Sequence, residues 1–203
     1  MILKAVIFDV GGVFIRTHSR AGREKWAVKF GLDPGKFENF VFSAESGRQA
    51  RLGQKTSAAH WRWLGDYFGL TEKELVELQR DFFAGDSFNK PLLEQMIRLR
   101  KAGYRTGLLS NFWDSARQFW AEVYPFAENF DDIVISAEVG LMKPDPQVYH
   151  LAARRLGVMP AETLFVDDFI ENIAGARVIG MQTLHFSDPE AAQRELAGMT
   201  GVA

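Results

Sequence analysis

The chain has no cysteine among its 203 residues. Disulfide bonds, thiolate nucleophiles and cysteine-based zinc or iron–sulfur centres are therefore excluded. The four histidines also lack the spacing of metal ligands. A chain without cysteine is compatible with a reducing compartment, and we expect the protein to be cytoplasmic.

Strong charge and long apolar runs are also missing. The formal net charge is −2, so bulk electrostatics gives no attraction for nucleic acid or an anionic membrane. No apolar stretch approaches the roughly 18 residues that would suggest a membrane span. The N-terminus enters an apolar segment without the basic region and cleavage site of a signal peptide. We therefore expect no nucleic-acid partner and no membrane partner.

One carboxylate stands out among the residues that are present. The continuous apolar run Ala5-Val6-Ile7-Phe8 leads into Asp9, followed closely by Gly11 and Gly12. Such a run predicts a buried parallel strand, over about residues 3–8. An acid after it lies at the sheet edge where open α/β folds bind ligands, and the glycines allow close backbone approach. Asp9 alone is therefore a candidate nucleophile, metal ligand or turn cap.

Three further segments have the same form of an apolar strand followed by polar residues. Residues 104–109 precede Ser110 and Asn111, residues 132–135 precede a turn with Lys143, and residues 163–166 precede Asp167 and Asp168. Helical patterns separate these strands, and a last strand is predicted at residues 182–186. Such alternation predicts a parallel sheet with right-handed crossovers. The predicted helices cover residues 114–122, 146–156 and 170–178, and another begins at Pro91.

Residues 17–86 interrupt this alternation with helices alone. Trp61, Leu64 and Phe68 form a helical stripe, and Thr71 with Glu74 is a capping-box pattern. We therefore predict a core domain of residues 1–16 and 87–203 with an inserted helical cap of residues 17–86.

The four motifs in this order resemble the haloacid dehalogenase-like (HAD) hydrolase superfamily over nearly the whole chain. The resemblance implies an α/β fold: a Rossmann-like three-layer core with a central parallel sheet, plus a small all-helical cap inserted after the first strand. It points to subfamily I with a C1 cap, and to sugar-phosphate phosphatase-like members whose first motif has an Asp-x-Gly form. It also implies that residues 14–17 form the flap and hinge that lead into the cap.

The same resemblance implies a site for phosphoryl transfer. Asp9 would be the nucleophile, and Asp9, Asp168 and the carbonyl of Gly11 would bind Mg2+, with Asp167 and Asn172 supporting them. Ser110, Asn111 and Lys143 would bind the phosphoryl group, and Gly11 and Gly12 would lie against it. From their position after Ser110 and Asn111, Phe112 and Trp113 are expected to line the pocket floor. Trp63 lies off the helical stripe of Trp61 and Phe68, so it is a candidate for contacting substrate. The implied substrate is a small phosphorylated metabolite, and the protein would be a monomer or homodimer.

Gly11 departs from the family pattern, because phosphatases of the superfamily usually carry a second aspartate two residues after the nucleophile. That aspartate protonates the leaving group. The substrate could have a good leaving group, such as an acyl or anomeric phosphate, or another group could supply the proton. His18 and Arg16 are near in sequence.

Two other functions stay open. A 2-haloacid dehalogenase also uses an aspartate nucleophile and lacks the second aspartate, but it needs no metal and uses a cap arginine. Arg48, Arg51 and Arg62 are candidates for that arginine. The adjacent carboxylates Asp167 and Asp168 favour a cation and hence the phosphatase. The third reading is a weakly active phosphate-binding protein.

Overall fold

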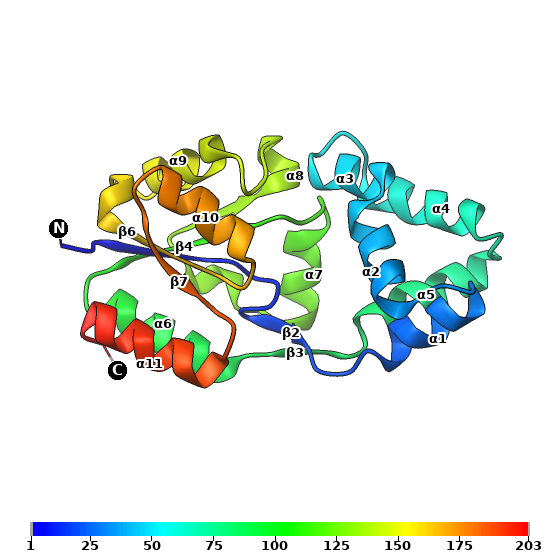
Figure 1. Cartoon of the computed structure of the whole chain (residues 1–203), viewed down its shortest axis with the longest axis horizontal. Helices are drawn as coiled ribbons and strands as arrows, with labels where there is room; N and C mark the ends of the chain where they lie inside the picture. Colours follow the sequence, from blue (N-terminus) through cyan, green and yellow to red (C-terminus); the bar gives the residue numbers. More distant parts are fainter. Residues whose placement is uncertain (1, 203) are drawn as a thin grey trace.

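The computed structural model describes residues 2–202. Its centre is a sheet of five parallel strands in the order β5-β4-β1-β6-β7 (Figure 1). This confirms the predicted α/β fold with a helical insertion after the first strand. The strands are β1 (Ala5–Phe8), β4 (Arg105–Ser110), β5 (Asp132–Ile135), β6 (Thr163–Asp167) and β7 (Gln182–His185).

The short central strand β1 is buried on both faces. Val6 and Phe8 pack into one apolar cluster, whereas Ala5 and Ile7 pack into the other, because successive side chains of a strand point to opposite faces. Helices cover both faces of the sheet (Figure 1). The first cluster includes residues of α6 (Lys90–Lys101), α7 (Ala116–Val123) and α11 (Pro189–Thr200). The second includes residues of α9 (Pro146–Arg155) and α10 (Ile170–Val178). Shorter elements are α8 (Ser136–Val139), η1 (Ala127–Asn129) and η2 (Pro160–Glu162).

The insertion after the first strand is helical, as predicted. Its helices are α1 (Ala21–Lys29), α2 (Pro34–Ser43), α3 (Glu45–Arg51), α4 (Ser57–Tyr67) and α5 (Glu72–Phe83). Helix α5 begins with the predicted capping box between Thr71 and Glu74, which satisfies backbone donors of its first turn. Trp61 and Leu64 are buried in a separate apolar cluster, and Phe68 packs against it. The cap therefore has a core of its own.

A two-stranded antiparallel ribbon joins the cap to the core. It consists of β2 (Ile15–Thr17) and β3 (Asp86–Phe88). Thr17 donates a hydrogen bond of 2.6 Å to Asp86, and buried Arg23 reaches the same carboxylate at 3.2 Å. The expected flap at residues 14–17 thus overlaps a paired strand. We propose that this ribbon is the boundary between a core of residues 1–16 and 87–203 and a cap of residues 17–86.

Among residues 2–202, no helix is both long enough and apolar enough to cross a membrane.

Candidate active site

The candidate site lies at the carboxyl edge of the sheet. Asp9 follows β1, Ser110 ends β4, and Asp167 ends β6, with Asp168 directly after it. The three strands are parallel neighbours with β1 in the middle, so their carboxyl ends meet at one edge. In Figure 1 this edge faces the helical cap.

Lys143 links two of the carboxylates. Its Nζ lies 2.8 Å from Asp9 Oδ1 and 2.7 Å from Asp167 Oδ2. All three side chains are buried: Asp9 is 7% exposed, Lys143 2% and Asp167 0%. The ammonium holds Asp9 in place by a strong, charge-assisted hydrogen bond. Removing one member of this buried set would leave an uncompensated charge.

Asp167 has its hydrogen-bonding capacity filled by its neighbours. Its Oδ1 accepts from the Phe169 backbone N–H at 2.8 Å. Asn172 Nδ2 donates to both carboxylate oxygens, at 3.0 and 3.1 Å, and Lys143 occupies Oδ2. The backbone carbonyl of Asn172 accepts from the Tyr149 hydroxyl at 2.8 Å. These contacts favour a role for Asp167 in positioning Lys143 over a role in binding a cation directly.

Asp168 presents the opposite situation. Its Oδ1 is buried and has no hydrogen-bond partner among residues 2–202, which is costly unless a cation or water satisfies it. Carboxylate oxygens of Asp9, Asp167 and Asp168 lie within 4.8 Å of one another. A Cβ built on Gly12 would come within 1.9 Å of Asp168 Oδ2, so glycine is required beside this carboxylate.

A hard divalent cation fits this donor set. Oxygen ligands are those that Mg2+ prefers, and Asp168 Oδ1 is an unused one. When ionised, the three carboxylates and the single ammonium of Lys143 leave an excess of two negative charges, which one divalent ion would cancel. Asp9 and Asp168 are therefore the side chains that would hold Mg2+.

The pKa values reflect the same excess of negative charge. Burial, together with Asp167 and Asp168, raises the pKa of Asp9 to about 8, although Lys143 opposes the shift. Burial and Asp167 raise the pKa of Asp168 to about 6. For Lys143, burial acts to lower the pKa, but Asp9 and Asp167 outweigh it and the pKa is raised. Lys143 is thus charged at neutral pH, whereas Asp9 needs more positive charge nearby to be a carboxylate at that pH.

Asn111 is tied to the backbone of Lys143. Its Nδ2 donates to the Lys143 carbonyl at 2.9 Å, and its Oδ1 accepts from the Lys143 N–H at 2.9 Å. The expectation from sequence was a donor to the phosphoryl group. The reciprocal pair adds a positioning role for Asn111 and leaves one N–H of Nδ2 for a ligand. Ser110 is buried at the end of β4, beside the strand that leads to Asp9.

The aromatic residues predicted to line the pocket lie in different places. Phe112 and Trp113 both line a pocket between the cap and α7. Trp63 is not among that pocket's lining residues and instead packs against Phe40 and Tyr67, with ring centroids 5.6 and 5.5 Å apart. Its contact with substrate stays a prediction.

The candidate cap arginines are also spread out. Arg62 lines the same pocket. Arg51 is half-buried with its Nε unpartnered among residues 2–202, and burial together with Arg48 lowers its pKa. Among residues 2–202, none of the three arginines forms a hydrogen bond or ion pair with Asp9.

Gly11 occupies open space. A Cβ built there would meet nothing within 4 Å, and its φ is not positive. The position therefore has room for a side chain, including the aspartate that the family pattern would place there. His18, one of the candidate substitutes for that acid, is exposed beyond the ribbon, and its N–H donates to the Gly85 carbonyl.

Sequence reasoning missed several supporting residues. Tyr149 reads as an ordinary helix residue, yet it fixes Asn172. Arg23 and Asp86 are 63 positions apart in the chain, so their contact at the hinge has no local signal. Trp113 was predicted to line the pocket, but its burial in the apolar cluster of the cap was not, because only the packing of the two parts reveals it.

An open parallel α/β sheet with a buried Asp–Lys–Asp set at its carboxyl edge and a helical cap above it defines a class of hydrolase. Residues 3–180 match the family model for haloacid dehalogenase-like hydrolases, and the chain belongs to this family.

Curated relatives include proteins of different activities. The chain is 32% identical over its full length to pig (Sus scrofa) bifunctional epoxide hydrolase 2, of which it spans 40%. It is 29% identical to a D-ribitol-5-phosphate phosphatase of Bacteroides thetaiotaomicron, over 90% of this chain and 91% of the relative. It is 26% identical to (S)-2-haloacid dehalogenase 4A of Burkholderia cepacia, over 91% of this chain and 83% of the relative.

The fold is shared with solved structures. A HAD family enzyme of Bacteroides thetaiotaomicron, solved with magnesium and inorganic phosphate, superposes with a TM-score of 0.74 at 23% identity. The match covers 90% of this chain and 93% of that one.

Proposed function

We propose that the protein is a Mg2+-dependent phosphatase that acts on a phosphate monoester through an aspartyl-phosphate on Asp9. The observation that carries the proposal is Asp168 Oδ1, a buried carboxylate oxygen without a partner among residues 2–202, within reach of Asp9. A divalent cation held between Asp9 and Asp168 would satisfy this oxygen. The magnesium and phosphate bound by the Bacteroides enzyme support the same assignment.

In this proposal a carboxylate oxygen of Asp9 attacks phosphorus, and the bond from phosphorus to the ester oxygen breaks. Lys143, held between Asp9 and Asp167, neutralises charge on the phosphoryl oxygens and on Asp9. Ser110 and the remaining N–H of Asn111 donate hydrogen bonds to the phosphoryl group. When bound by Asp9, Asp168 and the carbonyl of Gly11, Mg2+ would supply charge neutralisation. Water then attacks the phosphorus of the aspartyl-phosphate, releasing phosphate and restoring Asp9.

The leaving group receives no proton from position 11, because Gly11 has no side chain. A general acid contributes roughly 10²- to 10⁴-fold. The proposed enzyme should therefore prefer phosphates whose leaving group is already stable as an anion, such as acyl, anomeric or aryl phosphates.

The test is hydrolysis of acetyl phosphate, a sugar 1-phosphate and p-nitrophenyl phosphate, with Mg2+ and with EDTA. We expect turnover that needs the metal and is lost in Asp9→Asn. Asp66→Asn serves as the matched control, because Asp66 is an exposed carboxylate on α4 and its removal should leave the rate unchanged. Turnover that persists in Asp9→Asn would refute the proposal.

The dehalogenase remains the second candidate, because Gly11 and the Burkholderia relative both favour it. Release of chloride from 2-chloropropionate in EDTA, with no hydrolysis of any phosphate ester, would establish it. Tight phosphate binding without turnover of either substrate class would instead indicate a phosphate-binding protein.

A further inference from the structure

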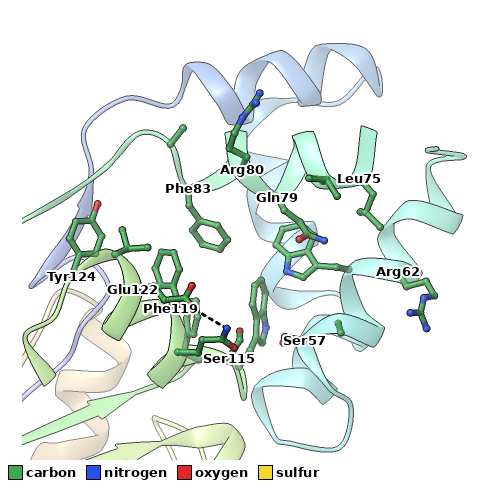
Figure 2. A pocket seen from close by; sticks show the side chains of 18 residues that line it. Ser57, Arg62, Leu75, Gln79, Arg80, Phe83, Ser115, Phe119, Glu122 and Tyr124 are labelled. Carbon is green, nitrogen blue, oxygen red and sulfur yellow. Dashed lines mark hydrogen bonds between the residues drawn. The ribbon is translucent and has the colours of Figure 1, made fainter. Parts of the chain in front are cut away.

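A pocket of about 790 Å³ opens between the cap and the core. Cap helices α4 and α5 form two of its walls, and core helix α7 forms the third (Figure 2). Its size lies within the usual range for sites that bind small organic molecules, roughly 300–1,000 Å³.

The lining of this pocket is mainly apolar. Figure 2 shows the Phe83 and Phe119 side chains beside it, with Leu75 on another part of the wall. Glu122, one of its few charged residues, already accepts a hydrogen bond of 2.9 Å from Gln118 (Figure 2). Such a surface favours hydrocarbon over a sugar, because a sugar would lose hydration at its hydroxyl groups with few partners to replace it.

The mouth of the pocket carries unusually exposed apolar side chains. Val76 on α5 is 66% exposed and Val123 on α7 is 47% exposed. They come from the cap and from the core respectively, so the apolar surface spans the junction between the two parts. A ligand there would bury apolar area on both sides, which stabilises binding.

The pocket adjoins the phosphoryl-binding residues through two consecutive aromatic residues. Phe112 and Trp113 line it and follow Ser110 and Asn111 directly in the chain. Two residues span at most about 7 Å, so the Cα atoms of Phe112 and Trp113 lie within that distance of those of Ser110 and Asn111 respectively. Asp9 and Lys143 are absent from the lining. The pocket thus lies next to the segment that carries Ser110 and Asn111 and does not include the nucleophile.

Trp113 also has an unused polar atom. The side chain is 1% exposed, and its Nε1 has no acceptor among residues 2–202. An unpaired buried donor is costly. The pocket wall therefore contains one buried donor that the described residues leave unsatisfied.

We propose that this pocket receives the apolar alcohol portion of the substrate, so that, among phosphate monoesters of equal leaving-group ability, those of hydrophobic alcohols are preferred. The inference rests on the proposed phosphatase activity. It assigns the cap–core junction, formed by α4, α5 and α7, as the region that recognises the leaving group.

The test is a series of straight-chain phosphates, from ethyl to octyl phosphate, assayed with Mg2+. Each methylene buried should raise kcat/KM by about four-fold until the chain outgrows the pocket. p-Nitrophenyl phosphate measures phosphatase activity as such. If p-nitrophenyl phosphate is hydrolysed but kcat/KM does not change with alkyl chain length, the substrate class is wrong and the phosphatase proposal still holds. No Mg2+-dependent turnover of any ester would overturn both.

Two variants at the mouth of the pocket and one control test where the alkyl chain binds. Val76→Asp and Val123→Asp place a carboxylate at the mouth of the pocket, whereas Val28→Asp does so on α1, outside the pocket, at a valine that is 75% exposed. The first two should lower kcat/KM for octyl phosphate by about ten-fold, with ethyl phosphate unchanged, and Val28→Asp should leave both unchanged. Equal effects of all three variants would show that the pocket does not hold the chain.

Binding gives a readout that does not depend on turnover. Octylphosphonate should inhibit competitively and bind much more tightly than ethylphosphonate, as measured by calorimetry. Equal affinities would overturn the inference.

Discussion

Different forces hold the side chains of two regions in place: the carboxyl edge of the sheet, here called the rim, and the helical cap. At the rim, Lys143 is ion-paired with Asp9 and Asp167 within 2.8 Å, and each polar contact fixes a direction. In the cap, rings such as Phe37, Phe82 and Trp61 pack edge to face, with centroids about 6 Å apart, and many arrangements would fill the same space. The polar contacts of the rim therefore fix the positions of the reacting groups, whereas the apolar packing of the cap mainly fills space.

The largest effect should come from breaking the buried ion pairs. Lys143→Met should lower the rate of phosphate ester hydrolysis by about 10³-fold, because it removes the charge beside the phosphoryl group. It should also destabilise the fold by about 3–5 kcal/mol, because Asp9 and Asp167 are left buried without a counter-ion. Enzyme kinetics and denaturant unfolding measure the two effects.

The matched control is an exposed lysine of the cap. Lys29 lies 2.6 Å from Glu74, and both side chains are more than a third exposed. Lys29→Met should change stability by less than about 1 kcal/mol and leave activity intact. Similar losses in the two variants would contradict the contrast between rim and cap.

The next effect should come from restoring an acid at position 11. The space around Gly11 is open, so Gly11→Asp should fold and raise the hydrolysis rate of ethyl phosphate by about 10²-fold. The rate for p-nitrophenyl phosphate should change little, because that leaving group needs no proton. The pH–rate profile for ethyl phosphate should gain a descending limb as the new acid ionises.

Position 12 provides the contrast. Gly12→Ala would bring a Cβ against the Asp168 carboxylate at a backbone φ of +72°. It should weaken Mg2+ binding and activity together. If Gly11→Asp raises the hydrolysis rate of no alkyl phosphate, weak substrate binding limits the reaction, and the missing proton donor does not.

The smallest effect concerns a buried histidine in the cap. Burial, with Lys55 and Arg51 nearby, lowers the pKa of His60 from 6.5 to about 4. Between these values the unfolded chain takes up a proton that the folded chain refuses, so this group's contribution to stability falls as the pH falls from 6.5 towards 4. Between pH 7 and pH 5 the loss amounts to roughly 2 kcal/mol.

The difference in unfolding free energy between wild type and His60→Asn isolates this contribution from the carboxylates at the rim. His60→Asn should be less sensitive to acid than wild type over this interval. An unchanged pH dependence would show that His60 is not kept neutral by its surroundings.

The two regions also differ in how far the sequence predicts them. Asp9 and Asp168 could be placed at one edge because parallel strands end together, and that rule needs only the strand pattern. The reciprocal bonds of Asn111 with Lys143 could not be foreseen, because they join residues 32 positions apart. The boundaries of the five strands in the main sheet are within about two residues of those predicted, since polar residues mark where burial ends. The ribbon strands β2 and β3 were not predicted.

The aromatic residues of the cap show where sequence reasoning stops. Trp61 and Leu64 were predicted to be buried from their helical spacing, and both are. Trp63 lies off that stripe and packs against Phe40 and Tyr67, and its contact with substrate stays a prediction. Periodicity says which residues share a face, but the neighbour across that face depends on how helices pack.

The most direct test of the account is to identify the residue that carries the phosphoryl group. The protein would be mixed with acetyl phosphate and Mg2+, quenched in acid, reduced with borohydride and digested for mass spectrometry. The account predicts conversion of Asp9 to homoserine, with no conversion in EDTA. Hydrolysis that proceeds with Asp9 unmodified, or with the label on another side chain, would contradict it.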